Sequence, residues 1–229
     1  MMRKGERNRI SDVAGVTVGH YTVDTPRHHT GGTVILPAPE GPFLFTHKMV
    51  AASAVLNGFG KAQGLVQIEE LGTLETPIAL TNTMNIGKVH DALVEYMARQ
   101  AEAHGVRLRS VNPIVGECND SALNEITERV IEKEHVFAAI ESAVVDFELG
   151  DVGAGKGNTC FGLKGGIGSA SRVFEVGKET YTLGVLVQSN FGEMENLRLD
   201  GKPIGRELAQ KLASSEQDKG SIMIVAATD

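Results

Sequence analysis

The chain carries a serine directly after a glycine, where a polar stretch meets an apolar one. Residues 215–220 are a polar loop, and residues 221–229 have the pattern of a buried strand. A serine in such a place commonly begins the strand and makes a local hydrogen bond. Alternatively, the Ser221 hydroxyl attacks the Gly220 carbonyl, and water hydrolyses the resulting ester. Gly220 suits that attack because it has no side chain to crowd it.

Cleavage between Gly220 and Ser221 would also create a base beside the nucleophile. The freed α-amine of Ser221 would have a pKa of about 8, which suits a general base next to the hydroxyl. A rigid strand would hold this new terminus in place. The two residues together therefore indicate a self-processing serine nucleophile as the alternative to an ordinary strand start.

Other arrangements that could carry chemistry are incomplete. Residues 150–157 approach a phosphate-binding loop, but Gly157 stands where a hydroxyl must follow the lysine, and Asn158 replaces the third glycine of a dinucleotide-binding turn. His28 and His29 are adjacent without a further ligand, so we expect no metal site and no cofactor. Cys118 and Cys160 lie far apart without paired spacing, which favours buried free thiols.

The composition indicates one globular domain without a nucleic-acid or membrane partner. The 229 residues suffice for one core, and no linker or repeat divides them, so residues 1–229 are interpreted as a single α/β domain. A net charge of -7 disfavours a phosphate backbone as partner. No apolar run is long enough to span a bilayer, and the short basic start of the chain does not resemble a signal peptide. A cytoplasmic location is the expectation.

The elements that would position the serine alternate between strands and helices. Glycine turns separate short strands near the start, and the spacing of apolar residues predicts a helix over residues 87–104. Further helices are predicted over 121–130 and 134–147. Core strands are predicted over 64–70, 78–83, 181–190 and 221–229.

Several stretches, taken in order, resemble one family of enzymes. They are residues 8–20, 56–60, 74–83, 115–120, 164–172, 185–192 and 220–224. They are distributed along nearly the whole chain, from residue 8 to residue 224, and together they resemble the L-aminopeptidase/D-esterase and β-peptidyl aminopeptidase family of self-cleaving serine aminopeptidases. In that likeness residues 1–220 correspond to the family's α chain, and 221–229 to the start of its β chain.

The resemblance implies roles for individual residues. Ser221 matches the nucleophile exposed by cleavage after Gly220, and Asn190 matches the asparagine whose amide stabilises the oxyanion. Glu117 matches an acidic residue that receives the substrate's ammonium group. Without the family, Asn190 would simply end a strand, and Glu117 would be a solvated loop residue. Asn119 stands where some relatives place a tyrosine as a second oxyanion donor; it could still donate a hydrogen bond there, so it is interpreted with Glu117 as a substrate-binding residue.

The resemblance also implies a fold and an assembly. The expected fold is a layered αββα sandwich, similar to N-terminal-nucleophile hydrolases but with different connectivity. The expected assembly is a homo-oligomer, commonly a tetramer, acting on short peptides, amides or esters. Family members continue for on the order of a hundred residues past the last strand, so this chain resembles a truncated member with weak or absent peptidase activity.

Two other functions fit the same sequence. An acyltransferase of the ornithine acetyltransferase type shares the fold and the self-processing, but its nucleophile is a threonine after an alanine, whereas Ser221 follows Gly220. The second alternative is an inactive fragment or binding module that kept the fold without the chemistry.

Overall fold

The computed structural model describes residues 2–37, 41–56, 58–212 and 220–229. Its main sheet has four strands in the order β1-β2-β5-β6, and a second sheet has three in the order β11-β10-β9. Most of the predicted loop over 215–220 and Asn57 of the family-like stretch lie outside the described residues.

The strands and helices follow one another along the chain with these bounds. The strands are β1 (Val16–Asp24), β2 (His29–Pro37), β3 (Met49–Val50), β4 (Thr73–Leu74), β5 (Ile78–Asn82), β6 (Ile114–Cys118), β7 (Thr159–Cys160), β8 (Leu163–Lys164), β9 (Gly166–Val176), β10 (Glu179–Asn190) and β11 (Ser221–Thr228). The α-helices are α1 (Leu65–Leu71), α2 (Ile86–Ala103), α3 (Lys133–Glu141) and α4 (Ile204–Lys211).

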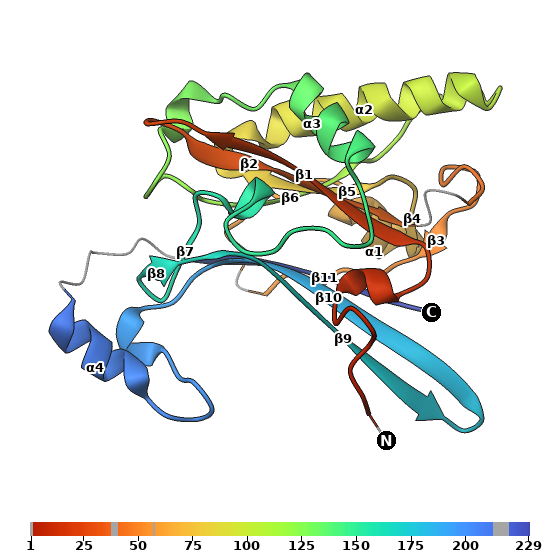
Figure 1. Cartoon of the computed structure of the whole chain (residues 1–229). Helices are drawn as coiled ribbons and strands as arrows, with labels where there is room; N and C mark the ends of the chain where they lie inside the picture. Colours follow the sequence, from red (N-terminus) through yellow and green to blue (C-terminus); the bar gives the residue numbers. More distant parts are fainter. Residues whose placement is uncertain (1, 38–40, 57, 213–219) are drawn as a thin grey trace.

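Successive side chains along the strands of the main sheet point to opposite faces, so the sheet contributes to two separate core clusters. Val34 and Leu36 of β2 pack against α2 and α3, whereas Ile35 between them packs toward the second sheet. This follows from the period of two along a strand. The result is a helical layer, the four-stranded sheet and the three-stranded sheet, stacked in that order (Figure 1).

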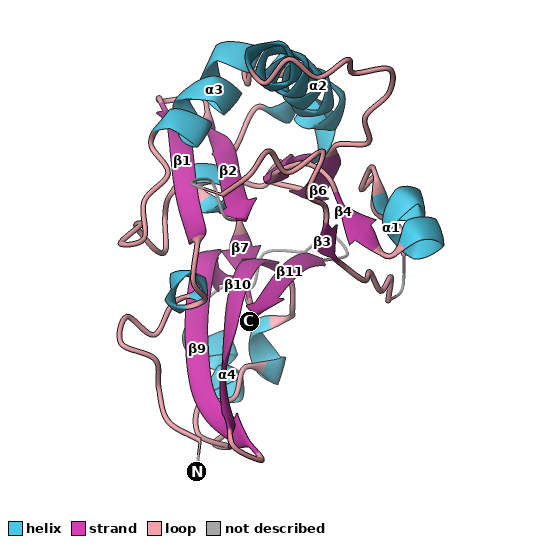
Figure 2. Cartoon of the chain, turned by 90° about the vertical axis from the view of Figure 1, so that its right-hand side faces the viewer, coloured by secondary structure: helices cyan, strands magenta, loops and turns pink. Residues whose placement is uncertain are grey.

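The layer order matches three layers of the αββα sandwich expected from the sequence. The outward side chains of the last strand, Ile222 and Ile224, are exposed at 43% and 59%. Helix α4 packs chiefly on the short turn η5 (Met194–Asn196), so the described helices do not form the fourth layer. Figure 2 shows the two sheets from the side, with α2 and α3 beyond the main sheet.

Several predicted elements are confirmed and others are wrong. The predicted helix over 87–104 is α2, and the strands over 78–83, 181–190 and 221–229 are β5, β10 and β11. Residues 64–70 form mainly the helix α1, not a strand, and 121–130 contain only turns and the short η3 (Ile126–Glu128). The helix predicted over 134–147 ends at Glu141. None of the helices in the described part of the chain has the length and apolarity to cross a membrane.

The close contact between β1 and α3 gives a test of this packing. A Cβ at Gly19 would lie 1.8 Å from the Ala139 carbonyl oxygen. We therefore expect Gly19→Ala to lower the free energy of unfolding by about 1–3 kcal/mol through overpacking. Urea denaturation measures the change.

The matched control is Gly87→Ala in the first turn of α2. No atom lies within 4 Å of a Cβ at that position, and alanine is the better helix former by up to about 1 kcal/mol. This variant should be at least as stable as the parent chain. Equal stability of the Gly19 variant and the parent would contradict the packing of α3 on β1.

Candidate active site

The ends of two neighbouring strands in the second sheet bring Asn190 and Ser221 together. The antiparallel register of β10 and β11 places these two residues directly opposite each other. The Asn190 side-chain Nδ2 donates a hydrogen bond to Ser221 Oγ over 3.2 Å. An amide donor therefore faces the hydroxyl for which the sequence suggested nucleophilic chemistry.

The orientation of the Asn190 carboxamide is fixed from both sides. Its Oδ1 accepts a hydrogen bond from the Thr159 backbone N–H at 3.0 Å. Its Nδ2 also donates to the Asn119 carbonyl oxygen at 2.8 Å. Because a flipped amide would lose both bonds, the NH₂ end is the one directed at Ser221.

Gly220 is required by its surroundings as well as by the proposed chemistry. A Cβ at this position would lie 2.5 Å from Phe191 Cα and 2.9 Å from the Asn190 carbonyl oxygen. The backbone of residue 220 thus passes too close to the end of β10 for a side chain. This close approach holds the Gly220–Ser221 peptide beside Asn190.

The main sheet contributes residues from the carboxyl ends of two parallel strands. Strands β5 and β6 pair in parallel, so their ends meet at one edge of the sheet. Glu117 near the end of β6 is only 6% exposed. Its carboxylate accepts hydrogen bonds from the Thr83 hydroxyl and from the Lys61 backbone N–H at 3.2 Å. The interpretation of Glu117 as a solvated loop residue is therefore wrong.

Glu117 and Cys118 point to opposite faces of β6. The Cys118 thiol donates to the Gln188 carbonyl of β10 over 3.7 Å, and it also contacts Ser221. Burial raises the pKa of Cys118 to about 12, although the hydrogen bond to Ser221 opposes this. Cys118 is therefore a neutral thiol packed against Ser221, while the bonded partners of Glu117 are Thr83 and Lys61.

Asn119 takes part through its backbone. Its carbonyl oxygen accepts from Asn190, and its side-chain Oδ1 accepts from the Ser121 backbone N–H at 2.9 Å. The exposed side chain thus caps a turn, whereas the sequence suggested a second oxyanion donor at this position. In the described structure, the carbonyl is the group of Asn119 that meets the site.

The buried side chain of Asp120 stabilises the same turn through hydrogen bonds. Its carboxylate accepts from the Thr30 hydroxyl at 2.5 Å and from Asn124 Nδ2 at 2.9 Å. The residue is 1% exposed, and burial raises the pKa of Asp120 above its ordinary value, against the lowering effect of these hydrogen bonds. A buried, bonded carboxyl group next to Asn119 fixes where the Asn119 carbonyl lies.

Sequence reasoning found the side chains of Ser221, Asn190 and Glu117. It missed the Thr83 hydroxyl and the backbone N–H of Thr159. Thr159 acts through its N–H, which every residue type except proline would supply, so no sequence signal marks it. Thr83 could have been found, because it follows β5 at the edge where Glu117 lies in the parallel neighbour. The adjacent histidines bond separate carboxylates, His28 with Glu128 and His29 with Asp24.

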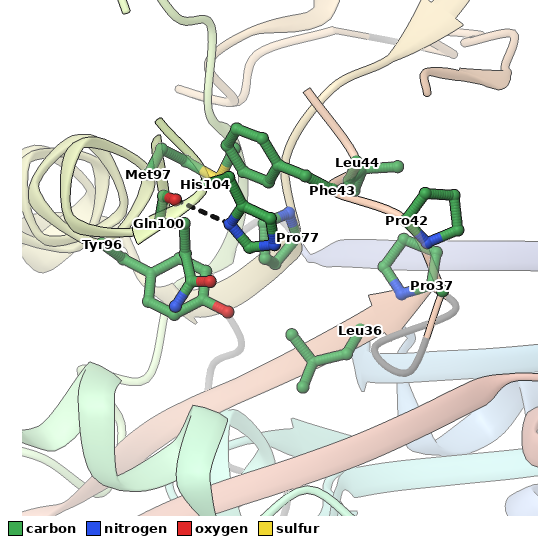
Figure 3. Close-up of a pocket in the computed structure, with 11 residues that line it drawn as sticks. Leu36, Pro37, Pro42, Phe43, Leu44, Pro77, Tyr96, Met97, Gln100 and His104 are labelled. Atoms are coloured by element: carbon green, nitrogen blue, oxygen red, sulfur yellow. Dashed lines mark hydrogen bonds between the residues drawn. The ribbon is translucent and has the colours of Figure 1, made fainter. Parts of the chain in front are cut away.

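A pocket elsewhere on the chain shares none of these residues. It lies between the carboxyl-terminal half of α2 and the segment around Phe43 (Figure 3). His104 stacks on Phe43 with ring centroids 4.8 Å apart, and Tyr96 and Pro77 complete its walls. The pocket is thus separate from the cluster around Ser221.

Several known proteins are similar to this chain. Residues 8–229 match the model of peptidase family S58. The β-peptidyl aminopeptidase BapA of Sphingosinicella xenopeptidilytica is 36% identical over 247 residues, a match that covers 98% of the chain and 60% of the relative. The chain thus spans less than two thirds of this curated relative.

Solved structures of other proteins are also similar to this chain. The PH0078 protein of Pyrococcus horikoshii OT3 has a TM-score of 0.90 and 45% identity, covering 100% of this chain and 65% of that protein. The L-aminopeptidase D-Ala-esterase/amidase of Ochrobactrum anthropi has a TM-score of 0.88 and 33% identity, covering 99% of this chain and 64% of that protein. The latter is described as a variant of the Ntn hydrolase fold, which confirms the predicted fold class.

The state of the Cys118 thiol can be tested by alkylation. Because Cys118 is buried with its pKa raised to about 12, iodoacetamide at pH 8 should leave it unmodified in the folded chain. The half-buried Cys160 should react first, and Cys118 should react only in denaturant. Peptide mass spectrometry after timed quenching gives both rates.

A Cys160→Ser variant provides the control, since its single remaining thiol should resist the reagent until the chain unfolds. Modification of Cys118 at the rate of Cys160 would show that the thiol is not packed against Ser221 as described.

Proposed function

The chain belongs to peptidase family S58, and from this premise we propose that it is a self-processing serine aminopeptidase with Ser221 as its nucleophile. One observation carries the proposal: the Asn190 amide, oriented in a single sense, directs its donor at the Ser221 hydroxyl. A pre-oriented donor beside a hydroxyl is what acyl transfer through a tetrahedral intermediate needs.

Self-processing would proceed in two steps. The Ser221 Oγ attacks the Gly220 carbonyl carbon, the Gly220–Ser221 C–N bond breaks, and the hydroxyl proton passes to the departing amine. Water then hydrolyses the ester, which leaves a carboxylate on Gly220 and a free amine on Ser221. Residues 1–220 and 221–229 would thereafter be separate chains, held together by the pairing of β10 with β11.

The same groups would then act on substrate. The Ser221 amine takes the hydroxyl proton as Oγ attacks the substrate carbonyl, and Asn190 Nδ2 donates to the oxygen that becomes negative. The leaving amine or alcohol departs with a proton, and water releases the acyl group from Ser221. No metal or organic cofactor enters these steps.

Selection for a free amino terminus is assigned to Glu117. A carboxylate that is 6% exposed and holds bonds from Thr83 and Lys61 keeps further lone pairs for a substrate ammonium group. A charge-assisted hydrogen bond there would reward substrates with a free amine. The substrates proposed are therefore short peptides, amides or esters with an unblocked amino terminus.

The relatives favour hydrolysis over acyl transfer to an amine. The named matches are a β-peptidyl aminopeptidase and an L-aminopeptidase D-Ala-esterase/amidase. Their names support a peptidase here, although the chain spans 60% of the length of the first.

A homo-oligomer, commonly a tetramer in the family that the sequence resembles, is part of the proposal. Support comes from the segment around β3 and α1, where Val50, Leu56 and Phe59 are exposed at 95%, 91% and 84%. Large apolar side chains exposed to this degree in one segment are typical of a surface that another subunit covers. The cytoplasmic location stays a prediction from the sequence.

Self-cleavage is the first test of the proposed function. Purified chain should convert on incubation to fragments 1–220 and 221–229, and Ser221→Ala should abolish this conversion because no hydroxyl remains to attack Gly220. Intact-mass spectrometry over time follows the reaction. A Thr228→Ala variant, which removes an outward hydroxyl from the same strand, should cleave at the parent rate.

The proposed mechanism is wrong if the Ser221→Ala chain is cleaved as fast as the parent. It is equally wrong if the cleaved parent chain hydrolyses amino-terminal amides no faster than the Ser221→Ala variant.

Substrate recognition by Glu117 is tested separately. Glu117→Gln keeps the acceptor for Thr83 or Lys61 and removes the negative charge, so KM for an aminoacyl amide should rise about 10- to 100-fold while kcat changes little. Steady-state hydrolysis of a chromogenic aminoacyl anilide measures both constants. The exposed Glu125→Gln variant is the control, and an unchanged KM in the Glu117 variant would refute the assignment.

A further inference from the structure

Lys164 holds the segment that fixes the Asn190 amide. Its Nζ donates to three backbone carbonyls, those of Gly155 at 3.0 Å, Asn158 at 3.1 Å and Gly165 at 2.8 Å. The same ammonium group pairs with Asp151 at 3.1 Å. A surface lysine commonly makes one loose ion pair, whereas this ammonium group meets four acceptors.

One peptide unit connects Lys164 to the candidate oxyanion donor. The carbonyl of Asn158 accepts from Lys164 and from the Gly165 N–H at 2.8 Å, while the N–H of the same peptide, on Thr159, donates to Asn190 Oδ1 at 3.0 Å. Asn158 is fully buried. The Asn158–Thr159 peptide is thus held at its oxygen and acts through its nitrogen.

Gly165 lets this peptide lie against β10. A Cβ at Gly165 would stand 2.5 Å from the Ser189 carbonyl oxygen and 3.1 Å from the Asn158 carbonyl carbon. The glycine therefore allows the short β7–β8 hairpin to press onto the end of β10, one residue before Asn190. The hairpin that carries Lys164 therefore packs directly on the end of β10 next to Asn190.

The hydrogen bonds that connect Lys164 with Asn190 also transmit polarisation. A cation that donates to a peptide carbonyl polarises the peptide and makes its N–H a stronger donor. That N–H in turn polarises the Asn190 carboxamide, whose Nδ2 faces Ser221 Oγ at 3.2 Å. The chain of bonds runs from the Lys164 ammonium group to Asn190 Nδ2, the group proposed to donate to the oxyanion of a tetrahedral intermediate.

We propose that Lys164 is a positioning residue for the oxyanion donor, acting on Asn190 through the Asn158–Thr159 peptide. This inference rests on the proposed aminopeptidase function, because it assigns the donor's task to Asn190. Lys164 touches neither Ser221 nor the substrate in this scheme. Lys164 instead sets the orientation and the donor strength of the Asn190 amide.

Lys156 offers a matched control within the same charged cluster. Its Nζ pairs with Asp151 at 2.8 Å and with Asp24 at 2.9 Å. Lys156 therefore shares the Asp151 carboxylate with Lys164, but its other ion pair is with Asp24 at the end of β1, and none of its described bonds reaches the Asn158 carbonyl. Loss of either lysine disturbs the Asp151 charge pairing, whereas only loss of Lys164 alters the path to Asn190.

The test is a double-mutant cycle on turnover. Lys164→Met should lower kcat about tenfold with KM within twofold of the parent, because a transition-state interaction is weakened. Lys156→Met should leave both constants within twofold. In an Asn190→Ala background, the Lys164→Met change should have no further effect on kcat, since its route of action has been removed.

Additive effects of the Lys164 and Asn190 variants would overturn the proposal, as would an equal loss of kcat in the Lys156→Met chain. A change in KM alone for Lys164→Met would also overturn it. Melting temperatures of the four variants show whether a loss of folded protein accounts for any change.

A second measurement does not depend on activity. With ¹⁵N-labelled Asn and Thr, the Asn190 side-chain NH₂ and the Thr159 amide should exchange hydrogen faster in Lys164→Met than in the parent or in Lys156→Met. Unchanged exchange and chemical shifts would overturn the coupling. If the exchange changes but Asn190→Ala leaves turnover unaffected, the proposed function fails while the coupling between Lys164 and Asn190 stands.

Discussion

The candidate site depends on the hydrogen bond between Asn190 and Ser221. The two residues are a directly opposed pair where β10 and β11 meet at the end of the second sheet. One end of the carboxamide is tied to the Thr159 N–H, and the other to the Asn119 carbonyl. Backbone groups from two separate segments thus fix the orientation of the Asn190 amide. The amide would therefore need to move little when a reaction occurs.

The register of β11 is in turn fixed by its apolar side chains. Met223, Val225 and Ala227 pack toward the main sheet, and Ile222 and Ile224 point outward. A slip of one residue would turn the whole inward set to the outer face and carry Ser221 away from Asn190. The core between the sheets therefore determines that Ser221 lies opposite Asn190 at the end of the strand.

Sequence patterns located the long and regular elements and missed those decided by individual contacts. Helix α2 repeats its apolar residues over eighteen positions, so its period is unambiguous. Residues 64–70 were predicted as a strand, yet Gly64 and Gly72, both in the left-handed region, bound a short helix there. The helix predicted over 121–130 fails because the Asp120 carboxyl and its hydrogen bonds to Thr30 and Asn124 hold the start of this stretch in turns. Ser221 was indicated both by its position after Gly220 and by family resemblance, and Asn190 and Glu117 by the resemblance alone. The carbonyl of Asn119 and the N–H of Thr159 have no signature in residue type.

A glycine controls how closely the two sheets meet below the site. A Cβ at Gly116 would lie 2.4 Å from Met223 Cε and 3.0 Å from Leu80 Cδ2. Two residues further along β6, Cys118 contacts Ser221, which lies two residues before Met223 on β11. The contact between Gly116 and Met223 therefore sets the distance between β6 and β11, and this distance also applies at Cys118 and Ser221. Glu117 lies between Gly116 and Cys118 on the same strand, so the close approach at Gly116 contributes to the distance between the buried carboxylate and the serine. In the proposed aminopeptidase, which would hold an amino terminus and a nearby carbonyl at once, that separation would limit which substrates fit, and it depends on packing in the core.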